Sequence, residues 1–328
     1  MSGMWTRRQF GFGVVGVGMA GGLSGVALAE GIAVARTTVG GVRMGLESYS
    51  LAAIPHEGAI DSLLTLMVEL NLKECSLYEQ LVQPTEMVEK LRVARGPTGV
   101  PTTDEEKAAF AKASGELRRW RVSVSLDMFR DLRKRFAARG IEFFAYSPWG
   151  MSATSSDAEL ERSCAIAQAL GAGVVTTGMA KSVAKRFAPM AEKAGLLVGI
   201  EGRPNVNSTD ADAIATPADY VEAMGYSKNY GIDLDVGDAT GGGFDVLAFL
   251  KANHARITTF NMKDRKKDRT SMPWGEGETP VGELLRIVQK ERYAIRCLID
   301  CDYATAPGGS RLEDVKRCMR YAEAVLRG

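Results

Sequence analysis

The feature that most constrains the fold is an alternation of short apolar segments with longer helical patterns, repeated eight times between residues 42 and 326. Short runs of apolar and β-branched residues predict buried strands, whereas apolar residues spaced three and four positions apart predict helices. The predicted strands cover Val42–Tyr49, Glu74–Tyr78, Ile141–Tyr146, Gly173–Thr177, Leu196–Glu201, Gly231–Val236, Ile257–Met262 and Ala294–Ile299.

Helical patterns lie between and after these strands. The segment Thr103–Arg139 is long enough for two helices, with the break predicted at Trp120–Ser123. Gly140, Gly171 and Gly195 lie where a helix should end before the next strand, because glycine tolerates the left-handed conformation found at many helix ends. The other predicted helices cover Ala59–Leu70, Ser156–Leu170, Ser182–Ala194, Pro217–Met224, Phe244–Asn253, Val281–Lys290 and Leu312–Leu326.

Eight strand–helix units with no linker between them predict one α/β domain, a (β/α)8 barrel, whose typical size is about 250 residues. A doubly wound sheet is the structural alternative. Such a sheet usually carries a glycine-rich phosphate loop after its first strand, and Ser48–Leu51 is not such a loop. We therefore expect residues 30–328 to fold as a single barrel domain.

Residues 1–29 have the pattern of an export signal. Arg7 and Arg8 precede an apolar stretch rich in Gly, Ala and Val, and Ala27–Ala29 matches a small-x-small cleavage pattern. The paired arginines resemble the twin-arginine signal. A transmembrane anchor is the alternative, but the apolar stretch is short and interrupted by glycine. We expect this segment to be a signal peptide and the mature chain to be periplasmic or otherwise extracytoplasmic, with no stable membrane anchor.

The export prediction can be tested by replacing Arg7 and Arg8 together with lysine. Because lysine keeps the charge but not the guanidinium groups of the paired arginines, we expect the protein to stay in the cytoplasm. N-terminal sequencing of the exported fraction measures the result. A mature chain that still begins near Glu30 outside the cytoplasm would contradict the prediction.

Composition excludes several classes of protein. Lys and Arg total 41 against 40 Asp and Glu, and this balance argues against a nucleic-acid-binding protein. His56 and His254 are the two histidines of the chain, so a metal cage of several histidines is impossible and any bound metal would have mostly oxygen ligands. The cysteines are widely spaced without a CxxC pair, which predicts buried apolar side chains instead of a zinc site or a disulfide framework. They are Cys75, Cys164, Cys297, Cys301 and Cys318.

Carboxylates follow four successive predicted strands, the fifth to the eighth. They are Glu201, Asp235, Asp264 and Asp300. A single carboxylate at a strand end usually caps the next helix. In a (β/α)8 barrel, however, the carboxyl ends of all strands meet at one face, where such barrels carry their chemistry. The run therefore predicts an acidic site at that face.

Three segments carry a family resemblance: Tyr230–Gly237, Met262–Lys267 and Pro273–Pro280. In these segments most specifically, and over essentially all of residues 30–328, the chain resembles the sugar phosphate isomerase/epimerase family of xylose-isomerase-like TIM barrels. Exported members with a twin-arginine signal are part of this family. The resemblance implies one divalent ion held by four strand-end residues, normally Glu, Asp, His and Glu.

Carried over by position, these four metal ligands are Glu201, Asp235, Asn261 and Asp300. Asn261 stands at the position of the family histidine, and Asp300 is one methylene shorter than the family glutamate. A second family histidine, three residues after the aspartate, is replaced by Asp238. The departures remove both histidines from the expected site.

The remaining oxygen ligands favour Mg²⁺, Mn²⁺ or Ca²⁺ over zinc. The alternative is a site that has lost its metal. Without a cation the carboxylates would repel one another, and some of them would be protonated or paired with Arg203 or Lys263. Both alternatives remain open from the sequence.

The family chemistry removes a proton beside a carbonyl and returns it elsewhere or on the other face, with one carboxylate as acceptor and another as donor. The resemblance assigns these catalytic roles to Glu201 and Asp300. The shorter Asp300 would draw back from a substrate by roughly 1 Å. Asp302 is expected to stay out of the site, because residues two apart in a strand lie about 6–7 Å apart along it.

Other positions are candidates for binding substrate: Arg203, Asp238, Lys263, Trp149 and Trp274. Each has a plainer alternative. Arg203 would neutralise the carboxylates, Lys263 would pair with Asp264 in a charged solvated loop, and Trp274 would only brace its own loop instead of stacking on a sugar.

The expected partner is a small-molecule carbohydrate, not nucleic acid, and a homo-oligomer is left open. A free sugar, keto-sugar or glycoside is favoured over a sugar phosphate, because no GxGxxG or phosphate-loop pattern follows any strand. The leading hypothesis is a metal-assisted isomerase or epimerase. The alternatives are a lyase or hydratase acting on a 3-keto-glycoside and a non-catalytic carbohydrate-binding protein descended from such a barrel.

Overall fold

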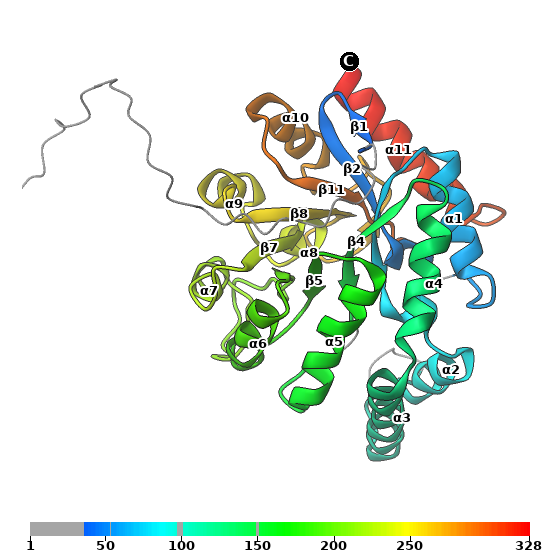
Figure 1. Cartoon of the computed structure of the whole chain (residues 1–328). Coiled ribbons are helices and arrows are strands. Elements are labelled where there is room, and N and C mark those ends of the chain that lie inside the picture. The colour runs from blue at the N-terminus through cyan, green and yellow to red at the C-terminus, as the bar shows by residue number, and fades with distance from the viewer. Residues whose placement is uncertain (1–35, 53, 97–100, 149–150) are drawn as a thin grey trace, which may run out of the picture. The chain divides into compact units, whose positions relative to one another are not determined.

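The structure is a computed structural model that describes residues 36–328 except 53, 97–100 and 149–150. The predicted signal peptide and Trp149 lie outside the described residues. Eight parallel strands form a closed barrel because the first, β2, pairs with both the second, β3, and the last, β11 (Figure 1). The predicted α/β barrel is therefore confirmed. Its strands are β2 Val42–Glu47, β3 Glu74–Tyr78, β4 Glu142–Ser147, β5 Val174–Thr177, β6 Leu197–Ile200, β7 Tyr230–Asp235, β8 Ile257–Met262 and β11 Arg296–Ile299.

Helices surround the strands in Figure 1 and pack their apolar faces against them. In the described residues, no helix is long and apolar enough to cross a membrane. The ten longest helices are α1 Ala59–Glu69, α2 Thr85–Ala94, α3 Asp104–Ser123, α4 Leu126–Ala137, α5 Asp157–Leu170, α6 Lys181–Lys193, α7 Pro217–Ala223, α9 Val246–Asn253, α10 Val281–Glu291 and α11 Arg311–Arg327.

The predicted helix bounds hold to within one or two residues, with two corrections. No pattern described above predicts α2, which packs beside α3 at the edge of the barrel (Figure 1). The break between α3 and α4 lies at Val124 and Ser125 instead of Trp120–Ser123, because the Ser125 hydroxyl accepts the Asp127 N–H at 3.1 Å and starts α4 there. Gly140, Gly171 and Gly195 have φ values of 67°, 79° and 69°, as their predicted place at helix ends requires.

Carboxylates end two of the strands. β2 stops at Glu47, whose side chain accepts the Tyr49 N–H at 3.2 Å and begins a short 3₁₀ helix, η1 Ser48–Leu51. β7 stops at Asp235, whose Oδ1 accepts the Asp238 N–H at 2.8 Å and begins α8 Val236–Gly241. The predicted strands run one or two residues further because a capping side chain, not the apolar pattern, fixes each end.

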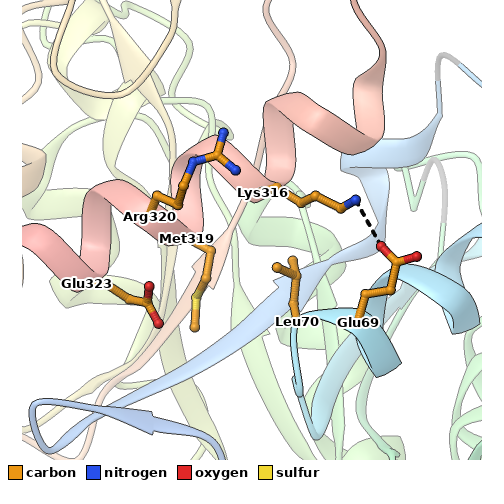
Figure 2. A pocket seen from close by; sticks show the side chains of 6 residues that line it. All are labelled: Glu69, Leu70, Lys316, Met319, Arg320 and Glu323. Carbon is orange, nitrogen blue, oxygen red and sulfur yellow. Dashed lines mark ion pairs between the residues drawn. The ribbon is translucent and has the colours of Figure 1, made fainter.

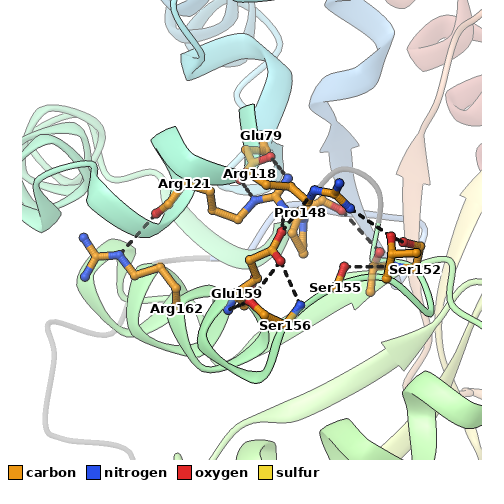
Figure 3. A network of polar contacts seen from close by, with 12 residues as sticks. Glu79, Arg118, Arg121, Pro148, Ser152, Ser155, Ser156, Glu159 and Arg162 are labelled. Atoms are coloured by element: carbon orange, nitrogen blue, oxygen red, sulfur yellow. Dashed lines mark hydrogen bonds and ion pairs between the residues drawn. The ribbon is translucent and has the colours of Figure 1, made fainter. Parts of the chain in front are cut away.

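A buried ion pair joins the wall of the barrel to its helices. Arg121 of α3 donates from Nε and Nη2 to the two carboxylate oxygens of Glu79, each at 2.5 Å. Glu79 belongs to η2 Glu79–Val82 and also accepts the Tyr146 hydroxyl of β4. Glu159 of α5 lies 4.0 Å from Arg121 on the other side (Figure 3). Tyr146, at a strand end, is thus a structural residue with no exposed surface.

Candidate active site

Lys263 lies among three carboxylates at the carboxyl ends of β7, β8 and β11. Its Nζ is 2.9 Å from Asp235 Oδ2, 3.2 Å from Asp300 Oδ2 and 3.4 Å from Asp302 Oδ2. The sheet register produces this arrangement, since Asp235 pairs with Asn261 and Ile299 pairs with Met262, one residue before Asp300 and Lys263. Lys263 is 6% exposed, so its charge is neutralised inside the protein.

Arg265 extends the cluster toward solvent. Its Nε lies 3.0 Å from Asp238 Oδ1 and its Nη2 donates to Asp302 Oδ2 at 2.6 Å. Arg265 belongs to a two-residue strand, β9 Asp264–Arg265, which pairs with β10 Ser271–Met272. We call Lys263, Arg265 and the four aspartates that they contact, Asp235, Asp238, Asp300 and Asp302, the two-cation network.

Two expectations are corrected by this network. Lys263 does not pair with Asp264, whose carboxylate instead accepts the N–H groups of Gly275, Gly277 and Thr279 at 2.8–3.1 Å. Asp302 is not held away from the site, because β11 ends at Ile299 and the chain beyond it is no longer extended. The distance expected between residues two apart in an extended strand therefore does not apply to Asp302.

Glu201 stands apart from the two-cation network. It follows β6 and is half-buried, and within the described part of the chain its carboxylate has no hydrogen bond or ion pair. Burial raises the pKa of Glu201 well above its ordinary value, and the nearby charges of Asp233 and Asp235 raise it further. A carboxylate without a fixed partner and with a raised pKa has the properties of a proton acceptor.

Other buried carboxyl groups inside the barrel also have raised pKa values. Burial raises the pKa of Asp235 to about 6 although Lys263 lowers it, and burial likewise raises the pKa of Asp300. Burial raises the pKa of Asp233 to about 7, partly offset by the Thr176 hydroxyl that it accepts. Burial, and next the charge of Asp300, raise the pKa of Glu47 to about 8. The site therefore holds several carboxyl groups that can carry protons near neutral pH.

Asp233 and Glu47 were not among the predicted site residues. Asp233 lies two positions before Asp235 in β7, so the alternation of the strand directs both side chains into the barrel. That spacing is a signal in the sequence. Glu47 also lies at a strand end, but it stands outside the run of carboxylates at the fifth to eighth strands on which the predicted site was based.

The raised pKa of Glu47 predicts how stability depends on pH. The folded protein favours the protonated acid, so this contribution to the free energy of unfolding is complete below the ordinary pKa of 4.5 and is lost as pH rises to about 8. Glutamine cannot ionise. We therefore expect the free energy of unfolding of Glu47→Gln, relative to that of the wild type, to increase by a few kcal/mol as pH rises from 4.5 to about 8. Urea unfolding at several pH values measures this difference. A constant difference across that range would contradict the assignment.

The four residues predicted to hold a metal were tested against the structure. Asp235 and Asp300 both form ion pairs with the Lys263 ammonium. Asp235 Oδ2, Asn261 Oδ1 and Asp300 Oδ1 are buried without a hydrogen-bond partner. In the described ranges, no group of three or more His, Cys, Asp or Glu side chains has an arrangement that could hold a metal ion. With a fixed ammonium between two of the expected ligands, these residues do not fit a divalent ion.

The remaining predicted substrate-binding residues are placed differently. Arg203 is exposed and forms no ion pair with the carboxylates described above, whereas Asp238 is held by Arg265. Trp274 is 4% exposed and packs edge-on against Tyr321 of α11, with ring centroids 6.1 Å apart. This contact joins the loop of Trp274 to α11. A role of any of the three in binding sugar stays a prediction.

A surface hollow lies away from this site. It has a volume of about 320 Å³ and is lined by Glu69, Leu70, Lys316, Met319, Arg320 and Glu323 (Figure 2). Lys316 Nζ bridges to Glu69 Oε2 at 2.9 Å across it. Leu70 follows α1 and precedes β3, so the hollow lies near the amino end of that strand, opposite the end that carries the carboxylates.

The comparisons with known proteins agree with the barrel. A family model described as "Xylose isomerase-like TIM barrel" matches residues 108–322. The fold is similar to that of L-ribulose 3-epimerase, with 12% identity, a TM-score of 0.59 and coverage of 87% of this chain and 95% of that chain. It is also similar to a sugar phosphate isomerase/epimerase from Parabacteroides distasonis, with 14% identity, a TM-score of 0.57 and coverage of 89% and 97%.

A third similar structure is the probable 3-DHS dehydratase AsbF from Bacillus anthracis. It has 11% identity and a TM-score of 0.55, and the match covers 84% of this chain and 97% of that chain. At such identities the likeness shows the fold alone. A search of curated proteins finds no match.

Proposed function

Since the chain belongs to the xylose isomerase-like TIM barrel family, we propose that it is an isomerase or epimerase that acts on a free sugar or keto-sugar by moving a proton between carboxylates. The observation that carries the proposal is the environment of the Glu201 carboxylate. Glu201 is a half-buried carboxylate with a raised pKa and no fixed partner in the described residues, and it lies where such barrels carry their chemistry. Sugar isomerases and epimerases are members of this family, which supports an enzymatic role.

In the proposed reaction, Glu201 takes a proton from the carbon beside the substrate carbonyl. The electron pair of the broken C–H bond forms the C=C bond of an enediolate, and the carbonyl oxygen gains the negative charge. Asp300 follows the eighth strand whereas Glu201 follows the fifth, so the two can approach a substrate from different sides. A proton returned by Asp300 then reforms the C–H bond, and exchange with water restores both carboxyl groups.

A divalent ion, which the resemblance implies, has no step in this proposal, because Lys263 lies between two of its four expected ligands. The remaining part of the proposal concerns location. The twin-arginine pattern at Arg7 and Arg8 supports an extracytoplasmic protein that meets free sugars and glycosides.

The test is proton exchange in deuterated water, followed by NMR, on a panel of ketoses and 3-keto-glycosides. We expect deuterium to enter the position beside the carbonyl, together with an isomer or epimer. Deuterium uptake with loss of the glycosidic substituent would identify a lyase instead. No exchange with any sugar, combined with a sugar-dependent rise in melting temperature, would identify a binding protein and overturn the proposal.

A further inference from the structure

We propose that the Lys263 ammonium is the built-in cation of this site and replaces the divalent ion, so that the site is complete without a metal. The part of this inference that concerns catalysis rests on the proposed function. The part that concerns metal binding does not, and it is tested separately.

The first argument is position. Lys263 Nζ lies within 3.4 Å of one oxygen of Asp235, of Asp300 and of Asp302. These oxygens come from chain segments that follow two different strands and converge on one point. An ammonium carries a positive charge and no lone pair, so it can form ion pairs with three carboxylates at once and cannot itself act as a metal ligand. A metal ion at this point would have to displace Lys263 from all three contacts.

The second argument is charge. Lys263 and Arg265 together bring two positive charges to the carboxylates of the two-cation network, which equals the charge of one divalent ion. The two cations share Asp302, whose Oδ2 lies 3.4 Å from Lys263 and 2.6 Å from Arg265. The network therefore spreads over two side chains the charge that a metal would concentrate at one point.

The third argument is the fit of the surrounding chain to Lys263. A Cβ atom added to Gly237 of α8 would lie 2.7 Å from Lys263 Cβ and 3.2 Å from Arg265 Cγ, closer than ordinary contacts. α8 can therefore approach the segment that carries both cations because residue 237 has no side chain. On the outer side, the Tyr49 ring centroid lies 5.0 Å from Lys263 Nζ, and Tyr49 is 38% exposed. A cation–π contact of this kind further fixes the ammonium.

Within the proposed reaction, Lys263 is then the cation that contacts Asp300, the carboxylate that returns the proton. A substrate oxygen that gains negative charge during proton removal would be stabilised by this fixed ammonium instead of by a metal. The consequence is an activity that does not depend on added divalent ions and is not lost on treatment with a chelator.

The experiment measures Mn²⁺ binding by electron paramagnetic resonance and melting temperature with Mg²⁺, Mn²⁺ or Ca²⁺. We expect the wild type to bind no stoichiometric ion and to show no shift. Lys263→Met removes the ammonium and leaves the carboxylates without a neutralising charge, so we expect this variant to bind Mn²⁺. Adding Asp235→Asn to Lys263→Met should abolish that binding. Lys263→Arg keeps the charge and should bind no ion. Lys267→Met removes a lysine that is 79% exposed in the same segment and should behave as the wild type.

Stoichiometric Mn²⁺ bound to the wild type and lost on Asp235→Asn would overturn the inference. If Lys263→Met does not fold, the wild-type titration still decides, because a bound ion there contradicts the role of Lys263. Proton exchange with and without a chelator separates the two proposals. Absence of exchange in every condition would remove the proposed function and leave the metal-binding result standing, whereas exchange that the chelator abolishes would overturn the role of Lys263 alone.

Discussion

Replacing Glu201 by glutamine is expected to lower the rate of proton exchange on a keto-sugar by about 10²- to 10⁴-fold, the range that a positioned general base contributes. Glutamine keeps the size of the side chain and one oxygen but cannot accept the proton. The carboxylate has no fixed partner among the described residues, so the substitution breaks no ion pair. The fold should therefore be kept and the melting temperature should not fall, because glutamine also removes a buried acid whose pKa is raised, while exchange is lost.

The matched control is Glu278→Gln, since Glu278 lies 46% exposed beside Lys267 and outside the two-cation network. It should retain wild-type exchange. Because Glu201 must be ionised to act as a base and burial raises its pKa, the wild-type rate should rise with pH above the range of an ordinary carboxylate. A Glu201→Gln variant that still exchanges its substrate proton at the wild-type rate would assign the base to another group.

Replacing Arg121 by methionine is expected to lower the free energy of unfolding by about 3–5 kcal/mol, the cost of removing one partner of a buried ion pair. Arg121 is 1% exposed and Glu79 has no exposed surface, so the Glu79 carboxylate would stay in the interior after it loses the guanidinium. Methionine preserves most of the apolar stem and limits the cavity. Urea unfolding measures the change.

Two comparisons separate this charge effect from lost packing. The double variant Glu79→Gln with Arg121→Met should recover part of the loss, because the Glu79 side chain then carries no buried charge. Arg92→Met removes a guanidinium from an exposed pair with Glu89 and should leave stability nearly unchanged. A loss for Arg121→Met as small as that for Arg92→Met would show that the buried pair (Figure 3) contributes little.

The fold was predictable from the sequence because each strand–helix unit carries its own local signal. Seven of the predicted helices and all eight strands depend only on spacing within a short segment, and the structure places each within a residue or two of its predicted bounds. The bounds fail where a side chain such as Asp235 caps the next helix. Local pattern cannot show that, because a cap depends on one hydrogen bond.

The site was predictable only in part. The strand-end positions of Asp235 and Asp300 follow from the alternation, and the structure brings these two residues together. The role of Lys263 depends on how β7, β8 and β11 align with one another, which no single segment encodes. The contact of Asp302 depends on the turn after β11. For a site without a metal, the sequence offered Arg203 and Lys263 as partners of the carboxylates, and the structure shows contacts with Lys263.

The closure of the barrel between its first and last strands has a consequence for the order of synthesis. Ser50 Oγ donates to the Ile299 carbonyl and accepts the Cys301 N–H, contacts between residues 249 and 251 positions apart. Until β11 leaves the ribosome, β2 and β8 are open sheet edges with unpaired backbone groups. A nascent chain that stops before β11 can therefore not close the barrel. A transport route that accepts only folded cargo would then select for chains that have been translated to the end.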